Sequence, residues 1–385
     1  MTSSALQVQD ICDYVCDFLY ESTKELRACS LLSPVFTSSA QRHLFREIGL
    51  TGAIGDPSNA SHASSRLCSV LAESPHLIRF IRRLRINFEQ DILVHLTQVP
   101  FTHVESIIMC APMPDSRFPH TVSALAAPLV ALPSVWRLQL IAITFENMES
   151  LRTLFHQRTT ALELTLELDD ANVFGWASMP PISQERRSLQ QTMVQVLTIN
   201  GQRIGDPGWL IHPLSPFSFS TLRESHIWCR TSPSILTLMR SAGPSLHTLR
   251  IDAREATPDF TLKDLRGLKI LDLFAGFGNA RPAAGLLASA GSAELRLEEL
   301  RVRVSVLGTL DNNSLRHLDD SIAELHAPHL RRVNILVSRI TLSWSGMDSV
   351  QFAAMMQEVR ALFPRLNARG CLRITYLTDG IFSEL

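Results

Sequence analysis

A short apolar pattern returns along most of the chain and limits what the chain can fold into. The pattern is an apolar residue, any two residues, a second apolar residue, any one residue and a third apolar residue, as in Ile81-x-x-Leu84-x-Ile86. Its middle positions recur 22 to 39 residues apart, and they are Leu84, Ile107, Leu138, Leu164, Leu197, Ser225, Leu249, Leu271, Leu300, Val333 and Leu372. Such regular return predicts one repeated structural unit rather than several unrelated domains.

Each copy of the pattern predicts a β-strand, because alternate residues of a strand point to opposite faces and the last two apolar residues then share one face. Helical patterns lie between several copies, at residues 235–239, 322–325 and 350–363. The series resembles leucine-rich repeats of the long, irregular kind. The resemblance implies an α/β solenoid over residues 76–385, with about 11 parallel strands inside and helices or loops outside. Because no single repeat covers its own apolar face, both ends need caps, and the 350–363 helix is one candidate.

The residues before the repeats have a helical pattern instead. The first helix has apolar residues spaced i, i+4, i+7 and i+8, and they are Ile11, Val15, Phe18 and Leu19. Ser22 and Glu25 have the spacing of a capping box, which predicts a second helix ending before Pro34. A third helix is expected from Thr37–Ser39 through Ile48. We therefore predict a three-helix module over residues 1–50.

Three motifs in this segment resemble an F-box. They are Asp10-Ile11-x-Asp13-x-Val15-x-x-Phe18-Leu19, Leu26-Arg27-Ala28-Cys29-Ser30-Leu31-Leu32-Ser33-Pro34 and Gln41-Arg42-His43-Leu44-Phe45. With its repeats, the chain is similar to the F-box-like proteins abundant in mushroom-forming fungi. The resemblance implies a substrate receptor of an SCF-type (cullin–RING) ubiquitin ligase, which docks a Skp-type adaptor through these helices. The residues implied for adaptor contact are Ile11, Val15, Phe18, Leu19, Leu26, Leu31, Leu32, Pro34, Leu44 and Phe45.

An alternative remains for these helices. F-boxes usually begin with a Leu-Pro pair, whereas Gln7-Val8 stands at the aligned position of this chain. The helices would then only cap the repeats of a scaffold with no ligase role. The first hypothesis expects the apolar face of residues 8–45 to be free for a partner, and the second expects it to pack against residues 67–86. Between the module and the repeats, residues 51–75 are expected to form a linker, with a loop rich in Gly, Ser, Pro and Asn at 51–66 and a short helix at 67–71.

A second interaction surface is expected on the concave face of the repeats. Residues that flank each middle position point away from the core, and many are charged or amidic. Arg is a favoured anchor of protein interfaces, so we expect a target protein there, although any solvated strand face would also be polar. The candidates are Arg83, Arg85, Arg137, Gln139, Glu163, His226, Arg250, Asp272, Glu299, Arg301, Arg332 and Asn334.

Composition narrows the function further. A net charge of −1 gives no field that would attract nucleic acid or an anionic membrane. No apolar run approaches the 18 residues of a membrane span, and no secretory signal is present. The seven cysteines are scattered and lack the spacing of a metal site, which predicts reduced thiols and a cytoplasmic or nuclear location.

Only one segment suggests an enzyme. Leu271-Asp272-Leu273-Phe274-Ala275-Gly276-Phe277-Gly278 looks like the strand and glycine loop of methyltransferases that use S-adenosylmethionine. Its Leu residues are nevertheless in phase with the repeats, and the remaining methyltransferase motifs are missing. A repeat strand followed by a glycine-rich turn explains it better. With no phosphate loop and no nucleophile–base spacing elsewhere, we predict no catalytic site, cofactor or metal.

Overall fold

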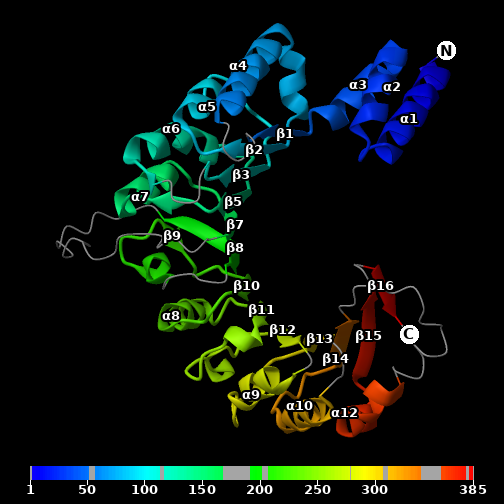
Figure 1. The fold of residues 1–385 in the computed structure, drawn as a ribbon, viewed down its shortest axis with the longest axis vertical. Helices are drawn as coiled ribbons and strands as arrows, with labels where there is room; N and C mark the ends of the chain where they lie inside the picture. The colour runs from blue at the N-terminus through cyan, green and yellow to red at the C-terminus, as the bar shows by residue number, and fades with distance from the viewer. Residues whose placement is uncertain are drawn as a thin grey trace. The chain divides into compact units, whose positions relative to one another are not determined.

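The computed structural model describes residues 2–51, 57–112, 117–167, 191–201, 207–277, 279–306, 311–339, 357–378 and 381–384 (Figure 1). The chain forms two compact units. The first consists of Met1–Thr192 with Leu214–Pro216, and the second consists of Met193–Pro213 with Phe217–Leu385. In each unit, the helices that connect the strands lie on one side of them, and no described connecting helix covers the other side, while the helices of residues 2–44 lie beyond the first strand. We refer to that uncovered side as the strand face.

The first unit begins with the predicted three-helix module. Its helices are α1 (Thr2–Phe18), α2 (Thr23–Leu32) and α3 (Pro34–Leu44). The side chain of Ser22 caps no backbone N–H, so the predicted capping box is not formed. α3 starts at Pro34 rather than at Thr37–Ser39, because proline suits the first position of a helix. Ile48 is not helical either, since it lies in an additional strand, β1 (Glu47–Leu50).

The strands of the first unit are parallel and in register. Their order is β1, β2 (Arg83–Asn87), β3 (Ser106–Cys110), β5 (Arg137–Ile141) and β7 (Leu162–Glu167). Ile48, Leu84, Ile107, Leu138 and Leu164 are directly paired from strand to strand. The connecting elements are α4 (Pro57–Glu73), the 3-10 helix η1 (Pro75–Phe80), α5 (Gln90–Leu96), α6 (His120–Val130) and α7 (Met148–Phe155). A small pair of strands, β4 (Arg117–Phe118) and β6 (Thr144–Phe145), lies beside them.

Helix α4 corrects the expectation of a loop over residues 51–66. It starts at Pro57, and its small residues Ala60 and Ser64 are buried. Ser64 Oγ lies 3.0 Å from Nδ1 of His95, which lies on α5 directly before the buried Leu96. The small side chains therefore let α4 approach α5 closely, and this packing outweighs the low helix propensity of Ser and Asn.

The second unit repeats the same arrangement. Its parallel strands are β8 (Thr192–Asn200), β10 (Glu224–Trp228), β11 (Thr248–Asp252), β12 (Ile270–Phe277), β13 (Glu299–Val306), β14 (Arg332–Arg339) and β15 (Leu372–Thr378), with β16 (Ile381–Glu384) antiparallel at the end and β9 (Phe217–Ser218) beside β8. The connecting elements are η3 (Pro207–Ile211), α8 (Pro233–Ala242), η4 (Ala253–Glu255), η5 (Leu262–Asp264), α9 (Arg281–Ala288), α10 (Asn312–Glu324) and α12 (Pro364–Ala368). Of the predicted 350–363 helix, residues 350–356 lie outside the described residues, and 357–361 are helical.

The repeated pattern is the core of both units. Every middle position from Leu84 to Val333 is 0% exposed, including the polar Ser225, and only Leu372 in the last copy is half-buried. Each fully buried Leu, Ile or Val contributes roughly 1.5–3 kcal/mol. In-register stacking of these residues confirms the predicted leucine-rich-repeat solenoid.

A buried arginine fixes the turns of the first unit. Arg158 is 1% exposed, and its guanidinium donates to the carbonyl oxygens of Val130, Val135 and Ala161 at 2.5, 2.6 and 3.1 Å. Burial lowers the pKa of Arg158 to about 10, so the side chain is still charged at neutral pH. Its guanidinium therefore supplies hydrogen bonds to three carbonyl groups at the end of α6, before β5 and before β7, which would otherwise lack a partner in the turns.

Candidate interaction surfaces

The N-terminal module packs around a very small core. Its buried members are Cys16, Leu26, Cys29 and Ala40, against which Leu19, Phe36 and Leu44 are partly buried. Burial raises the pKa of the Cys16 thiol, which keeps it neutral. Three helices with so few large buried side chains form a marginal core, so polar contacts between the helices matter more here than in the repeats.

Hydrogen bonds and ion pairs join α1 to α3. The Ser39 hydroxyl donates to the Asp13 carboxylate, and Gln9 Nε2 lies 2.9 Å from Asp13 Oδ1 and 2.8 Å from Ser39 Oγ. The hydrogen bond from Ser39 holds the pKa of Asp13 below its ordinary value. Arg42 Nη2 lies 2.9 Å from Asp17 Oδ1. These contacts fix the orientation of α1, whose opposite side carries apolar residues.

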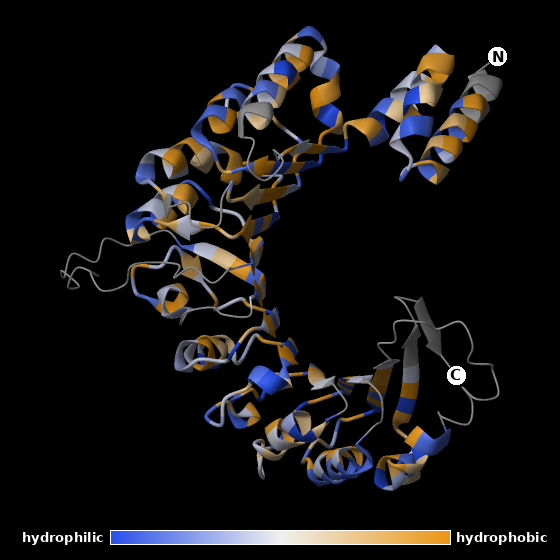
Figure 2. Cartoon of the chain, viewed as in Figure 1, coloured by the Kyte–Doolittle hydropathy of each residue, from blue (hydrophilic) through white to orange (hydrophobic). Residues whose placement is uncertain are grey.

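Large apolar side chains lie on the surface of the same module. Phe18 is 80% exposed, Leu31 86% and Leu32 73%. On α1 the exposed apolar residues are spaced as one face of a helix, and they are Val8, Ile11, Tyr14 and Phe18. Figure 2 shows apolar residues along these helices, which have few neighbours among the described elements. Clustered exposed apolar side chains are typical of interaction surfaces.

The structure divides the predicted adaptor-contact residues into three groups. The exposed residues are Ile11, Phe18, Leu31, Leu32 and Pro34. The half-buried residues are Val15, Leu19, Leu44 and Phe45. Leu26 is 2% exposed and belongs to the module core. A buried side chain supports the bundle and makes no direct contact with a partner, so the expectation for Leu26 is corrected.

The first repeats contact the module through another side. α3 contacts η1, and the carbonyl oxygen of Arg46 accepts hydrogen bonds from the backbone N–H groups of Arg82 and Arg83 at 2.9 and 3.0 Å. The attachment therefore runs through the end of α3 and through β1. Under the cap hypothesis the apolar face would pack against residues 67–86, yet Phe18 and Leu31 remain exposed.

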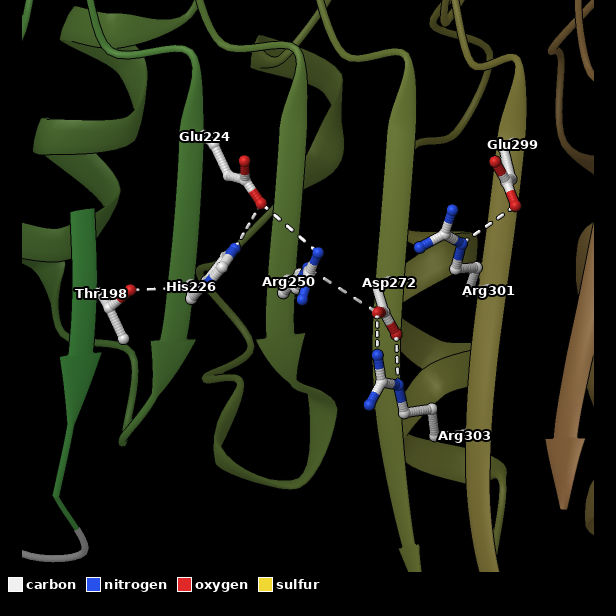
Figure 3. Close-up of polar contacts among 8 residues, drawn as sticks. All are labelled: Thr198, Glu224, His226, Arg250, Asp272, Glu299, Arg301 and Arg303. Carbon is white, nitrogen blue, oxygen red and sulfur yellow. Dashed lines mark hydrogen bonds and ion pairs between the residues drawn. The ribbon is translucent and has the colours of Figure 1, made fainter. Parts of the chain in front are cut away.

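On the second unit, polar side chains of adjacent strands lie side by side on the strand face and form two groups of contacts (Figure 3). We define the polar ladder as Thr198, Glu224, His226, Arg250, Asp272, Glu299, Arg301 and Arg303. The register pairs its central members in sequence, as His226 with Arg250, Arg250 with Asp272 and Asp272 with Arg301. His226 Nε2 lies 2.6 Å from Glu224 Oε1, and its Nδ1 lies 3.3 Å from Thr198 Oγ1.

Asp272 is the most buried charge of the polar ladder. Its carboxylate is 1% exposed and receives both Arg303 Nη2, at 2.6 Å from Oδ2, and Arg303 Nε, at 3.1 Å from Oδ1. Arg250 Nε lies farther away, at 3.9 Å. The prediction that Asp272 contacts a partner is therefore corrected, since this side chain orients two arginines instead. Arg303 was missed, although the strand alternation that placed Arg301 also applies two residues later.

Glu299 forms the next group of the polar ladder. Arg301 Nε and Asn334 Nδ2 lie 2.9 and 2.8 Å from Glu299 Oε1. The hydrogen bond from Arg301 lowers the pKa of Glu299, and the same contact raises the pKa of Arg301. Both groups are therefore charged at neutral pH. Arg332, paired with Glu299 in the register, is exposed.

The strand face of the first unit is also polar. Arg137 Nε lies 2.8 Å from Glu163 Oε1, and Gln139 Nε2 donates to Glu167 Oε1 at 2.6 Å. The Arg137 guanidinium also lies 4.8 Å from the ring centroid of Trp136, which is 47% exposed. The predicted residues Arg83 and Arg85 are exposed on neighbouring β2, and Arg83 Nη1 lies 3.8 Å from Glu47 Oε2. Each predicted residue on this unit thus points away from the core.

The segment resembling a methyltransferase loop is part of strand β12. The register shifts between Phe274 and Gly276, and Gly276 has a φ of 95°. A Cβ at Gly276 would lie 2.3 Å from Arg254 Cδ. The glycine is thus required by a β-bulge that packs against Arg254. The interpretation as a repeat strand is confirmed, but the strand extends through Phe277 where a turn was expected, and Gly278 lies outside the described residues.

The described part of the chain shows neither a metal site nor a membrane-spanning helix. Within it, no group of three or more His, Cys, Asp or Glu side chains could hold a metal ion. No helix among the same residues is long and apolar enough to cross a membrane. All seven cysteines are free thiols.

The chain was compared with family models, curated proteins and solved structures, and only the last gave matches. No family model matches the chain. No curated protein matches it either. Among solved structures, an internalin (inlF) from Listeria monocytogenes is similar at 13% sequence identity, over 85% of this chain and 93% of the internalin chain, with a TM-score of 0.32. The repeat architecture stated above rests on the strand register and burial of the chain itself.

Proposed function

We propose that this chain is a non-enzymatic protein-interaction subunit, the substrate receptor of an SCF-type ubiquitin ligase. In this role the N-terminal module docks a Skp-type adaptor and the strand face of the repeats holds a target protein. The observation that carries the proposal is the exposed apolar surface at Phe18, Leu31 and Leu32, on helices whose sequence resembles an F-box. The role belongs in the cytoplasm or nucleus, where the free cysteines stay reduced.

The energetics favour a partner on the module. Covering a large apolar side chain contributes roughly 1.5–3 kcal/mol, and a few such residues usually dominate an interface. The module core is too small to add much stability of its own. Binding at the exposed face would therefore also stabilise the folded module, since a ligand that binds only the folded state shifts the folding equilibrium.

The repeats would supply specificity. Residues of the polar ladder are held in place by their mutual contacts, so little side-chain ordering remains when a target binds. Neither surface needs reactive groups, because a receptor of this kind acts by bringing its target close to the ligase.

Co-expression of the full chain with a fungal Skp-type adaptor tests the proposal. We expect the Phe18→Ser/Leu31→Ser variant to reduce co-purified adaptor by at least about tenfold, because two anchors are lost. Val94 is a matched control, since it is an exposed apolar residue on α5 of the repeats, and Val94→Ser should leave recovery unchanged. Equal recovery with the double variant, or no recovery with the folded wild-type chain, would contradict adaptor docking.

The scaffold without a ligase role is the second candidate. It is favoured by Gln7-Val8, which stands where F-boxes usually have Leu-Pro. This hypothesis expects no adaptor in the purified material from any of the three chains. The same experiment therefore separates the two functions.

A further inference from the structure

A second surface lies where the module meets the first repeats. There, a cleft of about 600 Å³ is lined mainly by charged side chains from separate elements. Its arginines are Arg42 on α3, Arg46 directly before β1, Arg79 on η1 and Arg82 directly before β2. Its carboxylates are Asp17 and Glu105. We refer to this cleft, which is also lined by His43, Phe80 and His103, as the junction cleft.

Charge in the junction cleft is unbalanced. Arg42 pairs with Asp17 at 2.9 Å, and Arg82 Nη1 pairs with Glu105 Oε1 at 3.2 Å. Arg46 and Arg79 are exposed, and no carboxylate of the described residues pairs with either. Among the lining residues, four guanidinium groups face two carboxylates, and Arg42 also lies 3.8 Å from Asp13 Oδ2 behind the lining, so the unpaired positive charge belongs to Arg46 and Arg79. Like charges held together in a partly enclosed space repel one another, and a bound anion would remove that repulsion.

The backbone and one aromatic ring hold the cleft in shape. Arg46 and Arg82 are linked by the hydrogen bond from the Arg82 N–H to the Arg46 carbonyl oxygen. The Arg79 guanidinium lies 4.8 Å from the ring centroid of Phe80, which is half-buried and also lines the cleft. Stacking restricts the guanidinium and leaves its N–H groups available to a carboxylate. The Phe80 ring offers an apolar wall to the methylene groups of a Glu side chain.

We propose that the junction cleft binds a short, carboxylate-rich peptide segment of a protein partner. A long polyanion such as nucleic acid suits it poorly, because Asp17 and Glu105 lie among the arginines and the whole chain has a net charge of −1. A segment with two to four acidic residues matches the excess charge. The inference does not depend on which protein covers the apolar face of the module.

Fluorescence anisotropy on the full chain tests this proposal. The probe is a fluorescein-labelled peptide with four consecutive Glu residues in a Gly-Ser sequence, and the reference probe has Gln in place of Glu. We expect the Glu peptide to bind at least about tenfold more tightly than the Gln peptide, and its affinity to fall with salt. The Arg46→Gln/Arg79→Gln variant should weaken binding of the Glu peptide by about tenfold.

A control removes the same charge elsewhere. Arg281 and Arg316 are exposed residues of α9 and α10, so Arg281→Gln/Arg316→Gln should bind the Glu peptide like the wild type. Glu105→Gln should instead tighten binding by about twofold to threefold, because it removes a competing carboxylate. This gain of affinity cannot result from loss of folding.

Three results would overturn the proposal. They are equal affinity for the Glu and Gln peptides, an equal loss in the control variant, and equally tight binding of a single-stranded oligonucleotide. The Phe18→Ser/Leu31→Ser variant should keep its affinity for the Glu peptide. Failure of adaptor capture with intact peptide binding would thus contradict the proposed ligase function alone.

Discussion

The module and the repeats distribute apolar residues in opposite ways. In the repeats, the middle position of every copy from Leu84 to Val333 is fully buried, and charged side chains on the strand face pair with one another. In the module, the core is small and Leu31 and Phe18 lie on the surface. Neighbouring repeats therefore bury one another's apolar residues, whereas the module exposes apolar side chains that no described part of the chain buries.

The sharpest way to test this difference is one substitution made in both regions. Leu249→Ala should lower the free energy of unfolding by about 3 kcal/mol, because Leu249 is 0% exposed and its loss leaves a cavity. Leu31→Ala removes the same atoms from an 86% exposed side chain and should change the free energy of unfolding by less than about 0.5 kcal/mol. Urea denaturation measures both. A large loss for Leu31→Ala would show that its side chain is covered in solution.

A smaller effect is expected from the buried charge of the polar ladder. Arg303→Met should cost about 2 kcal/mol, because the 1% exposed carboxylate of Asp272 would lose its bidentate partner and keep only Arg250 at 3.9 Å. Asp272→Asn in the same chain should recover part of that loss, since an uncharged group is easier to bury. A double-mutant cycle by urea denaturation measures the coupling. Additive effects would mean that the pair is not formed.

The smallest effect is a dependence on pH. The pKa of Glu299 is depressed below its ordinary value of 4.5 by the hydrogen bond from Arg301. Its contribution to stability is therefore fully present above that ordinary value, and it is lost as the pH falls through the lower pKa of the folded state. Glu299→Gln should lose less stability than the wild type between about pH 6 and about pH 3. Identical losses in urea denaturation at the two pH values would exclude this contribution.

The repeats were predictable because their pattern has a direct physical cause. All eleven predicted strands are present, and residues such as Leu271 and Leu300 are paired as the shared pattern implies. A strand that must bury alternate residues against its neighbours has one register that does so. Ile48 was placed in a helix because β1 lacks the full pattern, and only its pairing with Leu84 identifies it.

The interaction surfaces were less predictable, since exposure depends on packing at a distance. Leu26 and Leu31 lie in the same helix with the same side chain, yet one is in the core and the other on the surface. Sequence spacing shows that they lie on different faces, but not which face meets α1 and α3. The junction cleft combines Arg46 and Arg79, which are 33 positions apart and share no motif.

Within each unit, the in-register pairing of the parallel strands gives the outward residues of the strand face defined positions. Neighbouring strands lie about 4.8 Å apart and alternate residues along each strand point the same way, so every outward residue has a defined place. Loops between strands can differ in length, as the 22- to 39-residue intervals show, without changing where the outward residues lie on the strand face. New recognition properties can therefore arise by exchanging single outward residues, such as those at the Arg250 or Arg332 positions, while the buried pattern stays constant.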